Sequence, residues 1–265
     1  MKKYNTTYYL LFVLLIMGSF AAMAQNDYGI TILGIVSFAF SFLFALQLIR
    51  LLTRKKTGYL WSFLELLSLI VLAMLLGLRV FYIHFDLVEL VFGVSGVVLV
   101  VVYIKKLIQT YSEIRMRNRW LSFLVVCFHL SLIFYTLSMV TVPFIPTLAE
   151  PAGAIAFALL IGFITASYLK KDIMLEGEKT SGFKFVGRFK DRSVVLASLF
   201  LLFTLYLGLT KVGVLPKMYS NEFPQSYFQL VNQAETGKEK PNKGKYKHEE
   251  FKEMYDRFVE RHDTR

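Results

Sequence analysis

Long apolar runs separated by short polar segments make up most of this chain. Six runs are each close to the roughly 20 residues that cross about 30 Å of hydrocarbon as a helix. They follow a shorter apolar stretch, Tyr8 to Phe20. The pattern predicts helices at 29–49, 59–83, 87–104, 121–142, 152–169 and 193–213. We therefore expect an all-α, polytopic membrane protein with six transmembrane helices, or seven if the first stretch is retained.

The first 24 residues have the order of a signal peptide. Lys2 and Lys3 form a positive start, a short apolar stretch follows, and Ala22-Met23-Ala24 matches a small-residue cleavage site. This pattern predicts cleavage after Ala24. The alternative is an uncleaved first membrane helix, since the next apolar run begins only a few residues later. In both cases the chain emerges on the outer side of the membrane at Asn26.

Composition supports a membrane location. The chain is 55% hydrophobic and 18% charged, with a mean hydropathy of +0.52, whereas soluble domains are about one quarter charged. Apolar residues spread over most of 265 positions exceed what one soluble core can enclose. A soluble enzyme, a disordered tail protein and a disulfide scaffold are therefore excluded.

The net charge of +11 comes from short segments between the apolar runs. The alternate connections, 83–87 and 142–151, contain no Lys or Arg. This bias is typical of a protein whose positive loops face the cytoplasm, so it indicates topology and no nucleic-acid partner. It places the C-terminus outside, in the periplasm if the membrane is a bacterial inner membrane. The basic segments contain Arg50, Arg54, Lys55 and Lys56; Lys105, Lys106, Arg115, Arg117 and Arg119; and Lys170, Lys171, Lys179, Lys184, Arg188, Lys190 and Arg192.

Three parts follow from these patterns: the signal peptide at 1–24, a six-helix transmembrane domain at 25–213 and a polar exported tail at 214–265. A helix at about 248–260 in the tail would carry one apolar stripe. So short a helix needs a neighbour, which is the protein's own outer surface, the membrane interface or a membrane or periplasmic protein partner. The stripe consists of Phe251, Met254, Tyr255, Phe258 and Val259.

Prolines and small residues mark the connection before the helix predicted at 152–169 and the helix itself. Pro143, Pro146 and Pro151 bracket the connection before 152–169, where they can end helices without breaking one in the hydrocarbon. The helix that follows is rich in Ala and Gly up to Gly162, which allows close helix contact. The same residue types pack helices within and between chains, so a homo-oligomer stays open.

Motifs for common chemistry are missing from the sequence. Cys127 is the only cysteine, so neither an intrachain disulfide nor a thiolate metal site is expected. Walker A, GxGxxG, HExxH and CxxCH patterns do not occur. We therefore expect no cofactor, no metal and no enzymatic activity.

Glu65 and His129 are the ionisable residues expected at similar depth inside the hydrocarbon. Such groups are costly there and are candidates for function. If their helices face each other, the pair could relay a proton or bind a cation. The alternative is structural: Glu65 is protonated or reaches toward Lys55 or Lys56, and His129 forms a neutral bond between helices.

A second polar group is expected near the outer face. It consists of Arg79, His84, Asp86, Glu89 and Glu150. His, Asp and Glu side chains ligate divalent cations, so His84, Asp86 and Glu89 could hold a metal or form a polar mouth for a solute. We favour the alternative, in which Arg79 pairs with a carboxylate at headgroup level and the other side chains are solvated.

Gly93-Val94-Ser95-Gly96 resembles the GxSG nucleophile motif of rhomboid intramembrane proteases. In that family the serine pairs with a histidine from another membrane helix, and His129 lies on the next predicted helix. The resemblance covers four residues. The Ala-His-x-x-Gly-type histidine context and the Trp-Arg loop signature are missing, and the helix order differs. We therefore interpret Gly93 and Gly96 as a helix-packing face.

Two functions follow as hypotheses. The first is a non-catalytic scaffold or assembly subunit whose exported tail docks a partner. The second is a small transporter or proton-coupled permease that uses Glu65 and His129 as an intramembrane polar site. A broken pair of helices at mid-membrane, a common sign of a substrate site, is not evident in the sequence.

Overall fold

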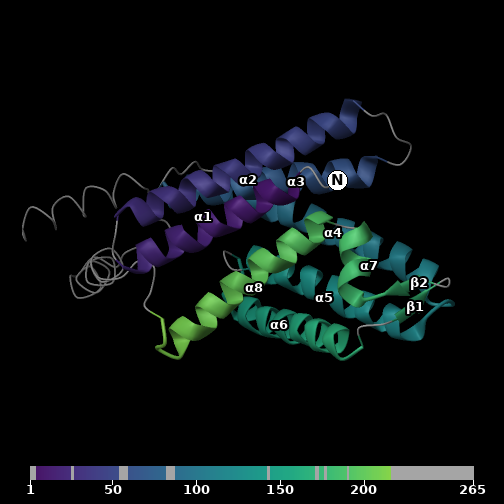
Figure 1. Ribbon diagram of the computed structural model, residues 1–265. Coiled ribbons are helices and arrows are strands. Elements are labelled where there is room, and N and C mark those ends of the chain that lie inside the picture. The colour runs from purple at the N-terminus through teal and green to yellow at the C-terminus, as the bar shows by residue number, and fades with distance from the viewer. Residues whose placement is uncertain are drawn as a thin grey trace, which may run out of the picture. The chain divides into compact units, whose positions relative to one another are not determined.

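The part of the chain that the computed structural model describes is mostly helical (Figure 1). Within the part of the chain it describes, seven helices are long and apolar enough to cross a membrane, namely α1 to α6 and α8. The prediction of a polytopic helical membrane protein is confirmed. The described residues are 4–24, 27–53, 59–81, 87–141, 144–170, 173–175, 178–189 and 191–215. The helices are α1 (Asn5–Met23), α2 (Asp27–Thr53), α3 (Leu60–Val80), α4 (Val88–Ile114), α5 (Arg119–Thr141), α6 (Pro146–Leu169), α7 (Gly182–Phe189) and α8 (Asp191–Lys211).

Two predicted helix boundaries were wrong. Helix α4 continues ten residues past the expected end at 104, to Ile114. Lys105 and Lys106 end the apolar run but do not end the helix, because no Gly or Pro follows before residue 115. Helix α6 begins at Pro146 and contains Pro151. Proline is well tolerated at the first position of a helix, and Pro151 removes only one backbone bond near the start.

The chain divides into two compact units, and the first comprises the described parts of 1–39, 74–86 and 212–265. Helices α1 and α2 approach each other closely in this unit. A Cβ atom added at Gly29 would lie 2.2 Å from the backbone nitrogen of Ala22, and one added at Gly18 would lie 2.8 Å from Ile32. At Gly29 a side chain would meet the backbone of α1, and at Gly18 it would meet the side chain of Ile32, so glycine allows close packing at both positions. Tyr8, Leu11 and Ala22 of α1 are buried.

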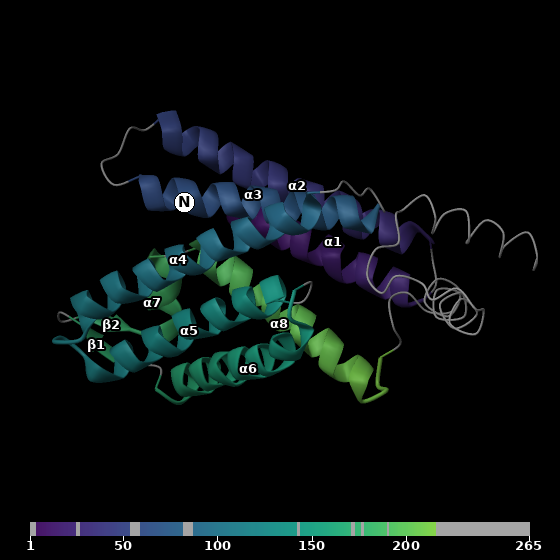
Figure 2. The same cartoon turned by 180° about the vertical axis from the view of Figure 1, so that it is seen from behind.

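The second unit comprises 40–73 and 87–211. Helix α5 contacts α4 and α6 along its length (Figures 1 and 2), and it has the largest share of buried residues among the membrane-spanning helices. The Asn118 carboxamide accepts a hydrogen bond from the Leu121 backbone N–H at 3.0 Å and so caps its N-terminus. Phe128 meets Phe163 of α6, with ring centroids 5.2 Å apart, and Tyr135 stacks on Phe200 of α8 at 4.8 Å.

A short hairpin and an amphipathic helix connect α6 to α8, in the third basic segment. Strands β1 (Ile173–Leu175) and β2 (Glu178–Thr180) pair antiparallel, a small addition to the expected all-α fold. Helix α7 then begins after Ser181, whose hydroxyl accepts a bond from the Lys184 backbone N–H. Phe185 and Val186 are buried whereas Phe183 and Lys184 are exposed. This alternation of buried and exposed positions makes α7 amphipathic.

Candidate functional site

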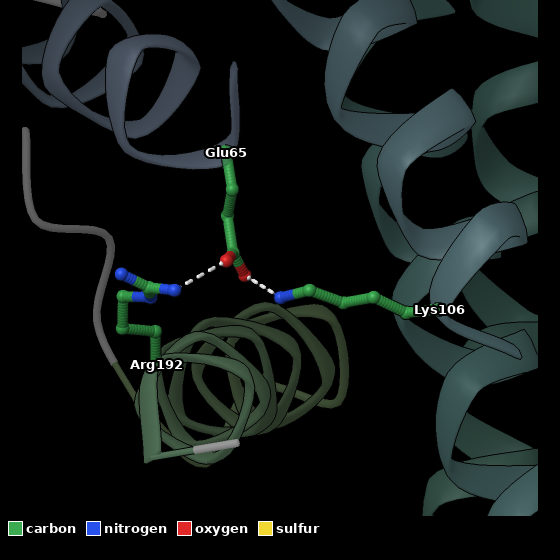
Figure 3. A network of polar contacts seen from close by, with 3 residues as sticks. All are labelled: Glu65, Lys106 and Arg192. Atoms are coloured by element: carbon green, nitrogen blue, oxygen red, sulfur yellow. Dashed lines mark hydrogen bonds and ion pairs between the residues drawn. The ribbon is translucent and has the colours of Figure 1, made fainter. Parts of the chain in front are cut away.

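Three charged side chains from three helices meet inside the second unit (Figure 3). Glu65 of α3 points between Lys106 of α4 and Arg192 of α8. The Lys106 ammonium donates a hydrogen bond to Glu65 Oε1, and Arg192 Nη2 lies 2.9 Å from Glu65 Oε2. We call these three residues the ion cluster. Each carboxylate oxygen therefore faces a different cation on a different helix.

Local sequence explains how the cations reach this point. Glu65 lies in the second turn of α3 and Arg192 is the second residue of α8. Lys106 is brought into the cluster because α4 continues as a helix beyond its apolar run. Its Nζ atom lies 5.3 Å from the ring centroid of Tyr103, one turn earlier on the same helix. Neighbouring Lys105 points elsewhere and lies 5.7 Å from the ring centroid of Trp61.

Burial makes the ion cluster energetically important. The Glu65 side chain is 0% exposed, and those of Lys106 and Arg192 are 14% and 23% exposed. Removing a carboxylate from water costs several kcal/mol, which is recovered only when partners of opposite charge and good geometry are present. The cluster meets this condition for the carboxylate. It also links α3, α4 and α8 at one point.

His129 is buried on α5 and contacts a backbone carbonyl of the same helix. His129 is 1% exposed on α5, and its Nδ1 lies 2.8 Å from the Val125 carbonyl oxygen one turn earlier. A proton on Nδ1 makes this contact a hydrogen bond. The imidazole also meets Phe128 edge to face, with ring centroids 5.5 Å apart. These contacts fit a core histidine held within its own helix.

The expected partner set of Glu65 was incomplete. Lys106 and Arg192 pair with Glu65 in the structure. The pairing of Glu65 with His129 stays a prediction from sequence, and Lys55 and Lys56 lie outside the described residues. The sequence identifies Lys106 and Arg192 only as members of the basic segments that indicate topology. No signal in the sequence distinguishes these two residues from the other basic residues of the same segments.

Only two side chains of the outer polar group are described, so its arrangement stays a prediction from sequence. Glu89, in the first turn of α4, and Glu150, in α6, are both exposed. Arg79 lies on α3, but its side chain, like His84 and Asp86, falls outside what the structure describes. The described residues contain no group of three or more His, Cys, Asp or Glu side chains placed to hold a metal ion.

The GxSG segment lies against the end of α5. A Cβ atom added at Gly96 would lie 1.9 Å from Val140 Cγ2, and one added at Gly93 would lie 3.1 Å from the ring of Phe144. Ser95 is buried between these glycines. The contacts support the helix-packing interpretation of this motif.

The structure does not add a functional contact for Cys127 or for the tail stripe. Cys127 is a free, buried cysteine on α5. The tail stripe formed by Phe251, Met254, Tyr255, Phe258 and Val259 lies outside the described residues. The partner-docking role of this stripe therefore stays a prediction from sequence.

Comparison with known proteins adds no relative to this picture. No protein-family model, curated protein or solved structure matches the chain.

Proposed function

We propose that this chain is a non-catalytic membrane subunit, a scaffold or assembly factor. One observation carries the proposal: Glu65, the buried carboxylate among the described residues, joins three helices through Lys106 and Arg192. A carboxylate with a cation on each oxygen is suited to fixing helix positions. His129, bonded to the Val125 carbonyl of its own helix, is likewise suited to a structural role.

The proposed location is a bacterial cytoplasmic membrane with the tail in the periplasm. The support is the charge bias of the short connections, which assigns the basic segments to the cytoplasm. The ion cluster agrees with this topology, because Glu65 lies in the second turn of α3 and Arg192 in the first turn of α8, whereas Lys106 lies in the second half of α4. Those three helix ends are the ones that the charge pattern assigns to the cytoplasm. Retaining or removing α1 leaves this orientation unchanged.

The exported tail is the proposed docking element. Its predicted stripe at 251–259 is apolar on one side and charged on the others, the form of an amphipathic helix that lies in a partner's groove. The test is purification in mild detergent of the full-length protein and of a form ending at Met218. A stoichiometric partner recovered only with the full-length form is the expected result.

A matched pair of substitutions sharpens this test. Changing Phe251 and Phe258 to Asp should abolish partner recovery, because both lie on the apolar stripe. Asp256→Asn lies on the charged side and should leave recovery unchanged. Equal membrane insertion of all forms is the control. Recovery of the same partner by the form ending at Met218 would contradict tail docking.

The second candidate is a small transporter or proton-coupled permease. Charged groups buried in a membrane protein favour it, because such groups are commonly part of solute pathways. Under this hypothesis Glu65→Gln and His129→Ala abolish flux in reconstituted vesicles when flux is compared at equal amounts of folded protein. Unchanged flux in both variants would remove this candidate.

A further inference from the structure

Apolar side chains are exposed where α4 begins and where α5 turns into α6. Leu87 immediately precedes α4 and Leu90 lies in its first turn. Phe144 follows α5, and the edge of its ring would lie 3.1 Å from a Cβ atom added at Gly93, one turn after Leu90. We call this group the outer apolar surface, because the charge pattern assigns both places to the outside. It consists of Leu87, Leu90, Phe144, Ile145 and Leu148, which are 47% to 60% exposed.

The outer apolar surface lies at the ends of helices. Gly96 packs against Val140, the second-last residue of α5, whereas α4 begins at Val88. The part of α4 that precedes Gly96 therefore extends roughly 10 Å past the end of α5. Membrane helices end at the level of the lipid headgroups, where exposed side chains meet water. Covering aliphatic side chains at this level with a second apolar surface is therefore favourable.

Acidic side chains border the outer apolar surface. Glu89 is next to Leu90 on α4, Glu150 lies near the start of α6, and both are exposed. The connections 83–87 and 142–151 contain no Lys or Arg. An occupant that complements this surface therefore carries an apolar stripe with positive charge beside it.

The C-terminal tail combines these two properties. Its predicted stripe at 251–259 is apolar. The segment 238–247, which directly precedes the helix predicted at 248–260, contains five lysines and one glutamate. An apolar stripe and an excess of positive charge are thus adjacent in the tail, as an apolar group and negative charge are adjacent on the outer apolar surface.

The tail leaves the membrane domain on the side of the outer apolar surface. Gly182 of α7 lies beside Leu124 near the start of α5, and the Thr204 hydroxyl of α8 donates to the Tyr135 hydroxyl farther along α5. Helices α5 and α8 therefore run in the same direction and end on the same side. A coil of the roughly 40 residues between α8 and the stripe has an end-to-end distance of about 35 Å. Such a tether gives the stripe an effective concentration of about a millimolar at nearby surfaces.

We propose that the apolar stripe of the tail packs on the outer apolar surface of the same chain, with the lysines of 238–247 beside Glu89 and Glu150. The inference rests on the proposed function, which orients the tail outward and gives the stripe a docking role. It adds a resting place for the stripe. A partner then competes with the outer apolar surface, and the fraction of chains with a free stripe sets the apparent affinity for that partner.

The test is disulfide cross-linking of the purified full-length protein in mild detergent, in a Cys127→Ala background. Leu90→Cys is combined with Phe258→Cys, and Phe144→Cys with Phe251→Cys. Under mild oxidation both pairs should form a disulfide within one chain, at a rate that does not depend on protein concentration. Mass spectrometry of the linked peptides identifies the product. Each pair tests the proposal by itself, so a fold defect in one leaves the other.

Two control pairs carry the same chemistry at other places. Ile108 is as exposed as Leu90, at 60%, and lies toward the opposite end of α4, so Ile108→Cys is combined with Phe258→Cys. Asp256→Cys, on the charged side of the predicted tail helix, is combined with Leu90→Cys. Both control pairs should link roughly tenfold more slowly, because the tether alone brings their thiols together.

Charge reversal tests the acidic border separately. Glu89→Lys with Glu150→Lys should slow linkage of the Leu90 and Phe258 pair roughly threefold at low ionic strength. High salt should remove this difference, because exposed charges are screened. An unchanged rate at low ionic strength would overturn the part of the proposal that places the tail lysines beside these two acids.

The remaining outcomes also decide the proposal. Equal rates for the stripe pairs and the control pairs would overturn it. Linkage only between chains, in a mixture of single-cysteine variants, would overturn it in favour of a second copy. A partner recovered only with the full-length form, without the disulfide within one chain, would overturn this inference and leave the proposed docking role standing. The disulfide without a recovered partner would support the inference and count against that role.

Discussion

Arg192 Nη2 lies 2.9 Å from Glu65 Oε2, and the ammonium of Lys106 bonds the other oxygen of the same carboxylate. This arrangement makes Glu65 a three-helix junction. The effect of this junction on protein stability can be measured without knowing a transported solute or a docking partner.

Glu65→Gln should strongly destabilise the protein. The substitution keeps the side-chain shape but leaves two partly buried cations without their counter-charge, and breaking a buried ion pair in this way costs about 3–5 kcal/mol. We expect a clear fall in Tm in mild detergent. Glu89→Gln changes an exposed carboxylate and should alter stability by no more than about 0.5 kcal/mol. Similar Tm values for Glu65→Gln and Glu89→Gln would mean that the three-helix junction does not stabilise the protein.

Lys105 and Lys106, which are adjacent on α4, should contribute differently to the free energy of unfolding. Lys106→Met removes a cation from buried Glu65, so a loss of about 3 kcal/mol or more is expected. Lys105→Met removes a contact with the Trp61 ring, which is worth about 0.5–1 kcal/mol at a partly exposed site. Unfolding of the two variants side by side checks this order. A larger loss in Lys105→Met would contradict the assignment.

Gly96→Ala should destabilise the contact between α4 and α5. The added methyl group would meet Val140 Cγ2 at 1.9 Å, and overpacking of this kind costs about 1–3 kcal/mol. Val140→Ala in the same chain should recover part of the loss. Gly162→Ala is the matched control, because nothing lies within 4 Å of a Cβ atom there.

Ser95→Ala distinguishes packing from catalysis in the same segment. If Ser95 only packs between helices, membranes containing the unsubstituted protein and membranes containing Ser95→Ala should cleave intramembrane protease substrates at similar rates. Loss of such an activity specifically in Ser95→Ala would instead support the rhomboid-like interpretation.

Cleavage after Ala24 stays the prediction from sequence, and an uncleaved first helix stays the alternative. The close approach of α1 and α2 at Gly18 and Gly29, with Tyr8, Leu11 and Ala22 buried, favours the alternative. If α1 is retained, Ala24→Leu should leave processing unchanged, as determined by N-terminal sequencing of the purified protein. An N-terminus at Gln25 would show that the small-residue pattern is a cleavage site.

The positions of the membrane helices could be predicted because apolar run length is a local property. The expected helix at 193–213 and the observed α8, Asp191–Lys211, differ by two residues at each end. Helix α4 was misjudged because a charged residue marks the end of the hydrocarbon, whereas hydrogen bonding and side-chain propensity decide where a helix ends. The packing role of Gly93 and Gly96 was predicted from residue type alone and is supported by their contacts.

The ion cluster could not be predicted because it depends on distant parts of the chain. Glu65 was recognised as a costly buried acid, but one sequence does not show which of many basic residues reaches it. Lys105 and Lys106 are adjacent and chemically identical, and only the rotation of α4 directs Lys106 to Glu65 and Lys105 to Trp61. The hairpin of β1 and β2 was missed for another reason: strands of three residues have too little pattern to predict.

Helix α5 and the ion cluster impose different requirements during biogenesis. Three hydroxyl side chains of α5 bond within or just before their own helix: Ser122 to Asn118, Ser131 to Phe128 and Thr136 to Leu132. These three hydroxyl groups can already be satisfied when the helix leaves the translocon for the lipid. Ser138, in contrast, donates to the Ala149 carbonyl of α6, and the Tyr135 hydroxyl accepts from Thr204 of α8. Glu65 of α3 depends on two later helices, because Lys106 belongs to α4 and Arg192 belongs to α8, the last of the described helices to be synthesised. The ion pair with Arg192 can therefore form only after nearly all of the described helices have been translated.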